Sequence, residues 1–364
     1  MAVKLKDIAN EVGLNISTVS RILSQPTSSV ASEATRRQVV EAARRLGYRP
    51  NAAARALASG RSGCVGIFAP ELQDPVFGHY IEVICDLLAE HGINGVAMRS
   101  GWEPDRETKL LESLQTRQID AALSLFYHRE HRDLYQRLHS QGLVVVFRVV
   151  DEPIENIGLD CVGVDISDAY ESLIRHMVER GYRRVAIIGG LIAEVLAQPH
   201  DRHSARSTPA SQVVASHAYP GVYWVQKIHH ELGLTFDPRL AIPCGPTAAQ
   251  AYQALQRHLQ DPNMPRFDGL IIQANKFIPG VQRALAEHSL QIPHDVGLAS
   301  VSDSEICQFG AVPTTVWNQP IEKICQGMVR LLMRRLADPH ASIATSSYSS
   351  HLIVRESTAG KRGA

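Results

Sequence analysis

The side chains best suited to binding chemistry lie near the start of the chain. A helix expected between residues 14 and 23 carries an apolar stripe, so its other positions face outward. Three of the outward positions are Ile16, Ser17 and Arg21. An arginine can bond to guanine O6 and N7, a serine can bond to several bases, and an aliphatic side chain can touch the thymine methyl. We interpret these three residues as candidate base-reading groups, with a phosphate contact as the alternative for Arg21.

Neighbouring positions suit the phosphate backbone, whose contacts orient a protein on DNA without reading the sequence. The candidates for these contacts are Leu5, Asn15, Thr18 and Ser20.

The elements that position these residues are short helices. Residues 5–12 have an apolar face, Gly13 can end that helix, and Asn15 is a good N-cap for the next. This pattern is typical of a helix-turn-helix. A third helix should begin after Ser32 and end before Pro50.

The segment after Pro50 is rich in helix-forming residues but only about two turns long. A helix of this length is marginal in water, so we expect it to order only on binding.

At this point the motifs together resemble the lactose repressor/galactose repressor family of bacterial transcription regulators. The matching elements are Asp7-Ile-Ala, Val12-Gly13, Thr18-Val-Ser-Arg21, Gly47-Tyr-Arg-Pro-Asn51 and Ala54-Arg-Ala-Leu57. The resemblance implies a hinge that enters the DNA minor groove, with Asn51, Ala54, Arg55 and Leu57 as its contact residues. An apolar wedge such as Leu57 can kink DNA, whereas its alternative role is ordinary packing.

Charge is distributed unevenly along a chain of zero net charge. Residues 1–62 contain ten Lys and Arg against four acids, so the remainder carries a matching negative excess. A basic head on an acidic body predicts nucleic-acid contact at one end. Because one headpiece makes few contacts, we expect a homodimer on pseudo-palindromic operator DNA.

Several other classes of protein are disfavoured. Six scattered cysteines without a CxxC motif fit reduced thiols in a cytoplasm, and we expect no cofactor. No signal peptide or long apolar run appears, so no membrane segment is expected. His200, Asp201 and His203 match no metal-site spacing, so no metal is expected.

From Gly63 onward, short apolar runs alternate with helical segments, which predicts an α/β fold with parallel sheets. We divide the chain into a helix-turn-helix headpiece (1–50), a hinge (51–62) and a two-lobed sensor (63–364). The expected first lobe is about 63–161 and 317–345, and the second about 162–316 and 346–358. Pro313–Val316 resembles the family's return crossing to the first lobe. Residues 191–217 break the alternation, which predicts a long loop.

The resemblance implies a periplasmic-binding-protein-like sensor with a small-molecule pocket between its lobes. The pocket candidates are Phe77, Arg148, Asn275, Lys276 and Ser302. The family's acidic positions fall on Arg148, Lys276 and Ser302, and its pocket arginine falls on Ala218. This gain of positive charge favours an anionic effector, a sugar acid or sugar phosphate. A neutral sugar and a pocket without ligand remain the alternatives.

The sequence therefore predicts a DNA-binding regulator, most simply a repressor, whose operator affinity responds to a metabolite. The competing interpretation is a clamshell binding protein or sugar-modifying enzyme without operator control. No nucleophile–base pattern supports catalysis.

The hinge generates the first testable prediction. Leu57→Ala should weaken operator binding while leaving the sensor's stability and ligand affinity intact, because a lost wedge removes DNA contacts only. Fluorescence anisotropy with labelled operator measures the first quantity, and thermal unfolding the second. Unchanged operator affinity would contradict the hinge role.

Overall fold

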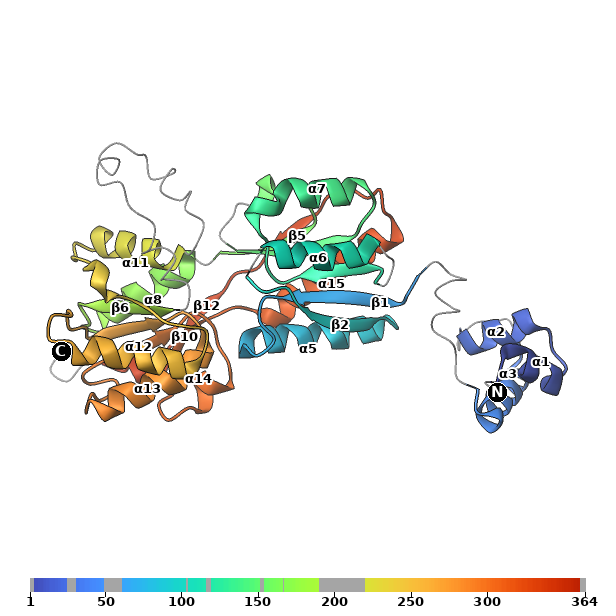
Figure 1. Ribbon diagram of the computed structural model, residues 1–364, viewed down its shortest axis with the longest axis horizontal. Helices are drawn as coiled ribbons and strands as arrows, with labels where there is room; N and C mark the ends of the chain where they lie inside the picture. Colours follow the sequence, from blue (N-terminus) through green and yellow to red (C-terminus); the bar gives the residue numbers. More distant parts are fainter. Residues whose placement is uncertain are drawn as a thin grey trace. The chain divides into compact units, whose positions relative to one another are not determined.

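The computed structural model describes residues 3–24, 31–48, 61–102, 104–115, 119–150, 154–165, 167–189 and 220–360. They belong to two compact units, Met1–Ser62 and Gly63–Ala364 (Figure 1). The hinge candidates Asn51, Ala54, Arg55 and Leu57 lie outside the described residues, as do Ala218 and the expected 191–217 loop.

The first unit contains the three predicted helices, α1 (Leu5–Val12), α2 (Ile16–Ser24) and α3 (Glu33–Leu46). Gly13 ends α1 at φ 66°, a left-handed conformation that favours glycine. Ser32 caps α3 by accepting a hydrogen bond from the backbone N–H of Thr35. The helices share a small core of Ile8, Ala9, Val19, Ile22, Val39, Ala42 and Ala43. The predicted turn at Gly13 and the predicted cap of the third helix at Ser32 are thus confirmed.

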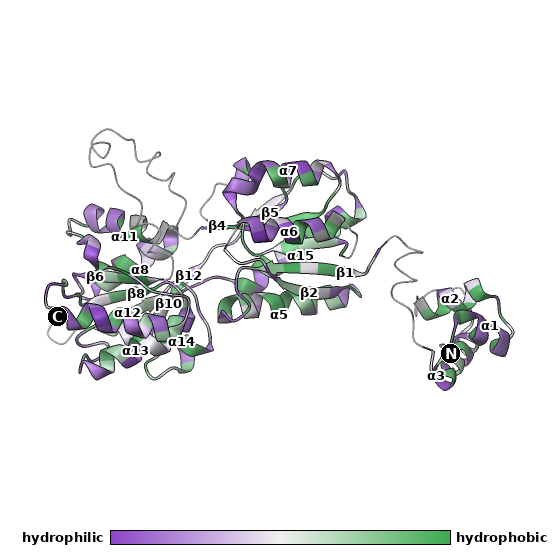
Figure 2. Cartoon of the chain, in the orientation of Figure 1, coloured by the Kyte–Doolittle hydropathy of each residue, from purple (hydrophilic) through white to green (hydrophobic). Residues whose placement is uncertain are grey.

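In the described part of the second unit, a first six-stranded sheet has the order β11-β5-β4-β3-β1-β2, all parallel. Its strands are β1 (Cys64–Ala69), β2 (Asn94–Arg99), β3 (Ala121–Ser124), β4 (Val145–Val150), β5 (Cys161–Val164) and β11 (Thr345–Ser347). Helices α5 (Pro75–Glu90) and α15 (Ile321–Ala337) pack on one face, and α6 (Pro104–Gln115) and α7 (Arg132–Ser140) on the other. Buried parallel strands need continuous apolar runs, and β1 is coloured as hydrophobic in Figure 2.

The second sheet has the order β12-β10-β9-β8-β6-β7, and only β12 among these strands runs antiparallel to its neighbour. Its strands are β6 (Val185–Gly189), β7 (Ala241–Pro243), β8 (Gly269–Ile272), β9 (Gly297–Ser300), β10 (Thr315–Asn318) and β12 (His351–Ile353). The helices of this lobe are α8 (Ser167–Glu179), α11 (Pro220–Glu231), α12 (Ala248–Gln260), α13 (Ile278–Glu287) and α14 (Glu305–Phe309). Short 3₁₀ turns occur in both lobes. The first lobe contains η1 (Arg129–His131) and η2 (Ile154–Asn156), and the second contains η3 (Pro238–Leu240), η4 (Asn275–Phe277) and η5 (Glu356–Thr358).

The chain passes between the two sheets after β5, after β10 and after β11. The expected return at Pro313–Val316 is therefore wrong by a few residues, since Thr315 and Val316 pair with β9 inside the second sheet. Residues 317–318 likewise belong to the second sheet and 346–347 to the first, which shifts the expected lobe limits slightly. Both shifts arise because a short strand lies at each crossing: β10 pairs with β9 and β12 inside the second sheet, and β11 forms an edge of the first.

A buried ion pair fixes the last helix to the first sheet. Asp160 and Arg335 are almost fully buried and lie 2.7 Å apart. The other Asp160 oxygen accepts a hydrogen bond from the backbone N–H of Ala344, which directs the chain into β11. Removing either partner would leave an uncompensated buried charge.

Candidate nucleic-acid interface and effector site

The exposed face of α2 carries the predicted base-reading residues. Ser17 and Arg21 are exposed, and 43% of the Ile16 surface is accessible, although Val19 and Ile22 on the opposite face are buried. A solvent-exposed isoleucine side chain can make an apolar contact, for example with a thymine methyl group. The geometry therefore places all three candidates on one outward surface.

The four phosphate candidates occupy different surroundings. Asn15 is exposed at the start of α2, where its carbonyl accepts the first helical hydrogen bonds, and Thr18 and Ser20 are half-buried. The Leu5 side chain packs against the core of the first unit. Leu5 can therefore contact a phosphate only through its backbone N–H at the start of α1.

Arg21 provides a test of base reading. Arg21→Ala should cost about 1–3 kcal/mol of binding free energy and relax the preference at one base position, because a bidentate guanine contact is lost. Competition binding with single-base operator variants measures this. The control is Arg37→Ala, which removes an exposed arginine of α3 that pairs with Glu33 at 3.8 Å. An equal loss for every operator variant would assign Arg21 to a phosphate.

In the sensor, side chains that follow several strands meet across the two lobes. Glu71 follows β1 and Trp102 follows β2 in the first lobe, whereas Lys276 follows β8 in the second. The Lys276 ammonium forms an ion pair with Glu71, and the Trp102 indole N–H donates to the other Glu71 oxygen at 2.8 Å. Ligands of parallel α/β sheets bind beyond the carboxyl ends of the strands. This meeting point is therefore the candidate effector site.

Aromatic rings pack around Trp102, the first-lobe partner of Glu71. Phe77 and Phe126 both make edge-to-face contacts with Trp102, with centroids 6.0 and 5.1 Å away. Asp74, which caps α5, lies close enough to interact electrostatically with both Lys276 and Glu71. Burial raises the pKa of Asp74. The site therefore combines apolar ring surfaces with charges of both signs.

Arg148 is buried and already hydrogen-bonded. Its guanidinium donates to the Tyr80 hydroxyl at 3.1 Å, the Leu125 carbonyl at 3.2 Å and the Gln319 side-chain oxygen at 2.8 Å. Gln319 in turn donates to the Ser302 hydroxyl at 3.2 Å. Arg148 and Ser302 are thus joined through the segment that crosses between the lobes.

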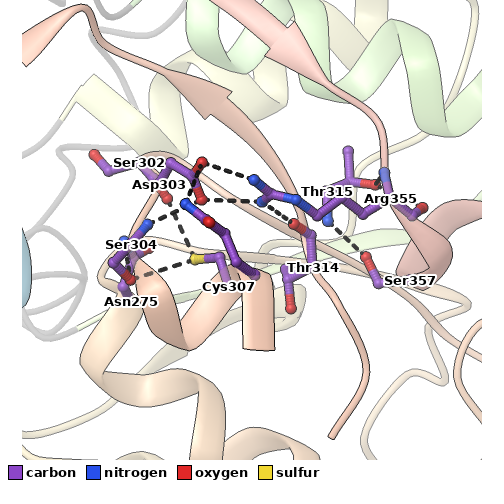
Figure 3. A network of polar contacts seen from close by, with 10 residues as sticks. Asn275, Ser302, Asp303, Ser304, Cys307, Thr314, Thr315, Arg355 and Ser357 are labelled. Carbon is purple, nitrogen blue, oxygen red and sulfur yellow. Dashed lines mark hydrogen bonds and ion pairs between the residues drawn. The ribbon is translucent and has the colours of Figure 1, made fainter. Parts of the chain in front are cut away.

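Asn275 belongs to a network of polar contacts in the second lobe, drawn in Figure 3. Its side chain is fully buried, accepts from Ser300 at 2.6 Å and donates to Ser304 at 3.1 Å. Asp303 forms a two-pronged ion pair with Arg355, with bonds of 2.9 and 2.7 Å (Figure 3). Asn275 therefore bonds to the end of β9 through Ser300 and to the loop after β9 through Ser304.

The structure connects Phe77 to Lys276 through Trp102 and Glu71. It also links Arg148 with Ser302 through Gln319. It places Asn275 in a structural network. Sequence reasoning missed Glu71, Trp102 and Gln319. The position of Glu71 just after an apolar strand was an available signal, but its pairing with Lys276 depends on how the lobes meet.

A second cluster of titratable groups lies in the first lobe. The Glu107 carboxyl is buried, bonds to the Tyr135 hydroxyl and accepts from Ser124 at 3.1 Å. Burial raises the pKa of Glu107 to about 7, against the opposing effect of these two hydrogen bonds. Burial lowers the pKa of nearby His128 to about 4. Charge on either group therefore destabilises this lobe.

Glu107 predicts a pH dependence of sensor stability. Its pKa is higher in the folded chain than its ordinary 4.5, so its favourable contribution is full below about pH 4.5 and is lost as the pH rises through about 7. In wild type, the free energy of unfolding should fall with rising pH as Glu107 ionises. Glu107→Gln should reduce that fall by up to about 3 kcal/mol. Urea unfolding from pH 5 to 8 measures it. His128 acts in the opposite direction, so each profile is compared with wild type, with exposed Glu90→Gln as control.

Two protein-family models match the chain. The model for bacterial regulatory proteins of the lacI family matches residues 4–51, and that for the periplasmic binding protein-like domain matches residues 174–358, about half of the chain. The chain belongs to the lacI family of bacterial regulatory proteins. The family resemblance inferred from the N-terminal motifs is confirmed.

Among curated relatives of this lacI-family chain is the HTH-type transcriptional regulator RegA of Clostridium saccharobutylicum. It is 25% identical, and the match covers 98% of this chain and 100% of RegA. The HTH-type transcriptional regulator CelR of Thermobifida fusca is 28% identical, with 97% of each chain covered.

Solved structures share the fold. The lac repressor dimer bound to operator and an anti-inducer matches with a TM-score of 0.76 at 18% identity, covering 98% of this chain and 99% of that one. The transcriptional regulator CelR–cellobiose complex matches with a TM-score of 0.61 at 24% identity and the same coverage. The predicted α/β fold with two parallel-dominated sheets is confirmed. Among the described helices, none is long and apolar enough to cross a membrane.

Proposed function

We propose that this chain is a sequence-specific transcription regulator, acting as a repressor, whose operator affinity is controlled by a sugar bound between the two sensor lobes. The observation that carries the proposal is the outward face of α2, where Ile16, Ser17 and Arg21 lie exposed beside one another. A regulator of this kind acts by binding rather than by catalysis, in the bacterial cytoplasm where its operator lies.

Two operator-bound copies are part of the proposal. One short recognition helix reads only a few base pairs, so two-fold pairing on a pseudo-palindrome supplies affinity and specificity. The likeness to a lac repressor dimer bound to operator supports this arrangement. We assign the headpiece to residues 1–50, the hinge to 51–62 and the sensor to 63–364, with the hinge coupling lobe closure to DNA binding.

A neutral sugar fits the described site better than the anion expected from the charge pattern. The positive charge of Lys276 is compensated by Glu71, and Arg148 is buried at 6% exposure with three hydrogen bonds of its own. Sugar hydroxyls can both donate to a carboxylate and accept from an ammonium, and apolar sugar faces pack on aromatic rings. The CelR–cellobiose relative supports the sugar class.

Selection from a random DNA library with the purified full-length chain tests DNA reading. We expect enrichment of a pseudo-palindromic sequence with two half-sites, and failure to enrich any sequence would contradict operator reading.

The aromatic rings generate a prediction for the effector. Trp102→Ala should weaken binding of a neutral sugar about tenfold or more, because it removes both stacking surface and the group that orients Glu71. Calorimetry with a panel of neutral mono- and disaccharides, including cellobiose, measures this. Trp224→Phe on α11 is the matched aromatic control. Equal sugar affinity in wild type and Trp102→Ala would place the effector elsewhere.

A further inference from the structure

Glu71 is held in place by two different partners. One carboxylate oxygen accepts from the Trp102 indole N–H of its own lobe, and the other pairs with Lys276 of the opposite lobe. The side chains of Glu71 and Lys276 are only 18% and 15% exposed. The carboxylate is therefore oriented by the indole toward the ammonium.

The partial burial of this pair increases the consequence of losing either member. Charges interact more strongly away from bulk water, and salt screens a partly buried pair less than an exposed one. Without Glu71, Lys276 would leave a positive charge at the candidate effector site. Without Lys276, the carboxylates of Glu71 and Asp74 would leave a negative one, since both interact with Lys276.

We propose that Glu71 determines the charge specificity of the effector site, admitting uncharged sugars and rejecting their acids by neutralising Lys276. This inference rests on the proposed function, because it concerns the sugar site of the regulator. A sugar hydroxyl can accept from Lys276 and donate to Glu71 in the same complex. A carboxylate or phosphate meets the like charge of Glu71 as it approaches Lys276.

Glu71→Gln is the informative change. Glutamine keeps a side-chain oxygen that can accept from the Trp102 N–H, but it carries no charge to balance Lys276. The site should then prefer an acid to its parent sugar. The double variant Glu71→Gln/Lys276→Gln removes both charges and should lose that new preference.

Charged quenchers of Trp102 fluorescence measure the local charge directly. The full-length chain is used in a Trp224→Phe background, where the remaining Trp317 is 1% exposed. Quenching by iodide, caesium and neutral acrylamide is compared. Glu71→Gln should raise iodide quenching relative to acrylamide at least twofold, because an unpaired ammonium attracts anions. Lys276→Gln should raise caesium quenching, and the double variant should return the iodide ratio toward the parent.

The matched control is Glu231→Gln, which neutralises an exposed carboxylate paired with Lys227 on α11. It should leave all three Trp102 quenching ratios unchanged. Iodide ratios that do not respond to Glu71→Gln, or a Trp102 that no quencher reaches, would overturn the proposal.

Calorimetry with cellobiose and cellobionate adds the ligand comparison. The parent should favour cellobiose, and Glu71→Gln should shift the ratio of affinities toward cellobionate tenfold or more. A parent that binds neither compound but shows the expected quenching ratios would support the charge assignment and count against this sugar. Preference of the parent for cellobionate would contradict the role of Glu71.

Discussion

The hydrogen bonds of one buried cation join several parts of the first lobe to a segment that crosses between the lobes. Arg148 in β4 reaches Tyr80 in α5, the carbonyl of Leu125 after β3, and Gln319 in the crossing segment. Gln319 continues the connection to Ser302 of the second lobe. Because a buried charge must keep its hydrogen bonds, the crossing segment is tied to the first lobe.

The parts of the fold that sequence reasoning predicted are those governed by local chemistry. Gly13 and Ser32 act at helix ends within a few residues of themselves, and the run Cys64–Ala69 forms a buried strand because it is apolar throughout. The sequence pattern indicates no strand at β7, β11 or β12, because each has only three residues, too few for a periodic pattern. Their place depends on neighbouring strands that are distant in sequence.

The charge balance of the candidate effector site depends on a contact that the sequence does not show. Counting substitutions against a family pattern identifies Arg148 and Lys276 as gains of positive charge, but it does not show what lies opposite them. Glu71 is 205 residues from Lys276, and only the folded lobes bring the two together. Arg148 lies among neutral acceptors beneath the surface. Charge sums along a chain therefore describe a site poorly when its residues come from both lobes.

The late position of α15 and β11 in the chain has a consequence for synthesis on the ribosome. The three helices of the first unit complete their shared core by residue 46, whereas the first sheet receives its last strand only at residues 345–347. Domains fold as units as they emerge. A nascent chain interrupted before α15 would carry a finished DNA-reading surface attached to an unfinished sensor. Quality control of truncated products therefore matters more for this architecture than for one whose sensor closes early.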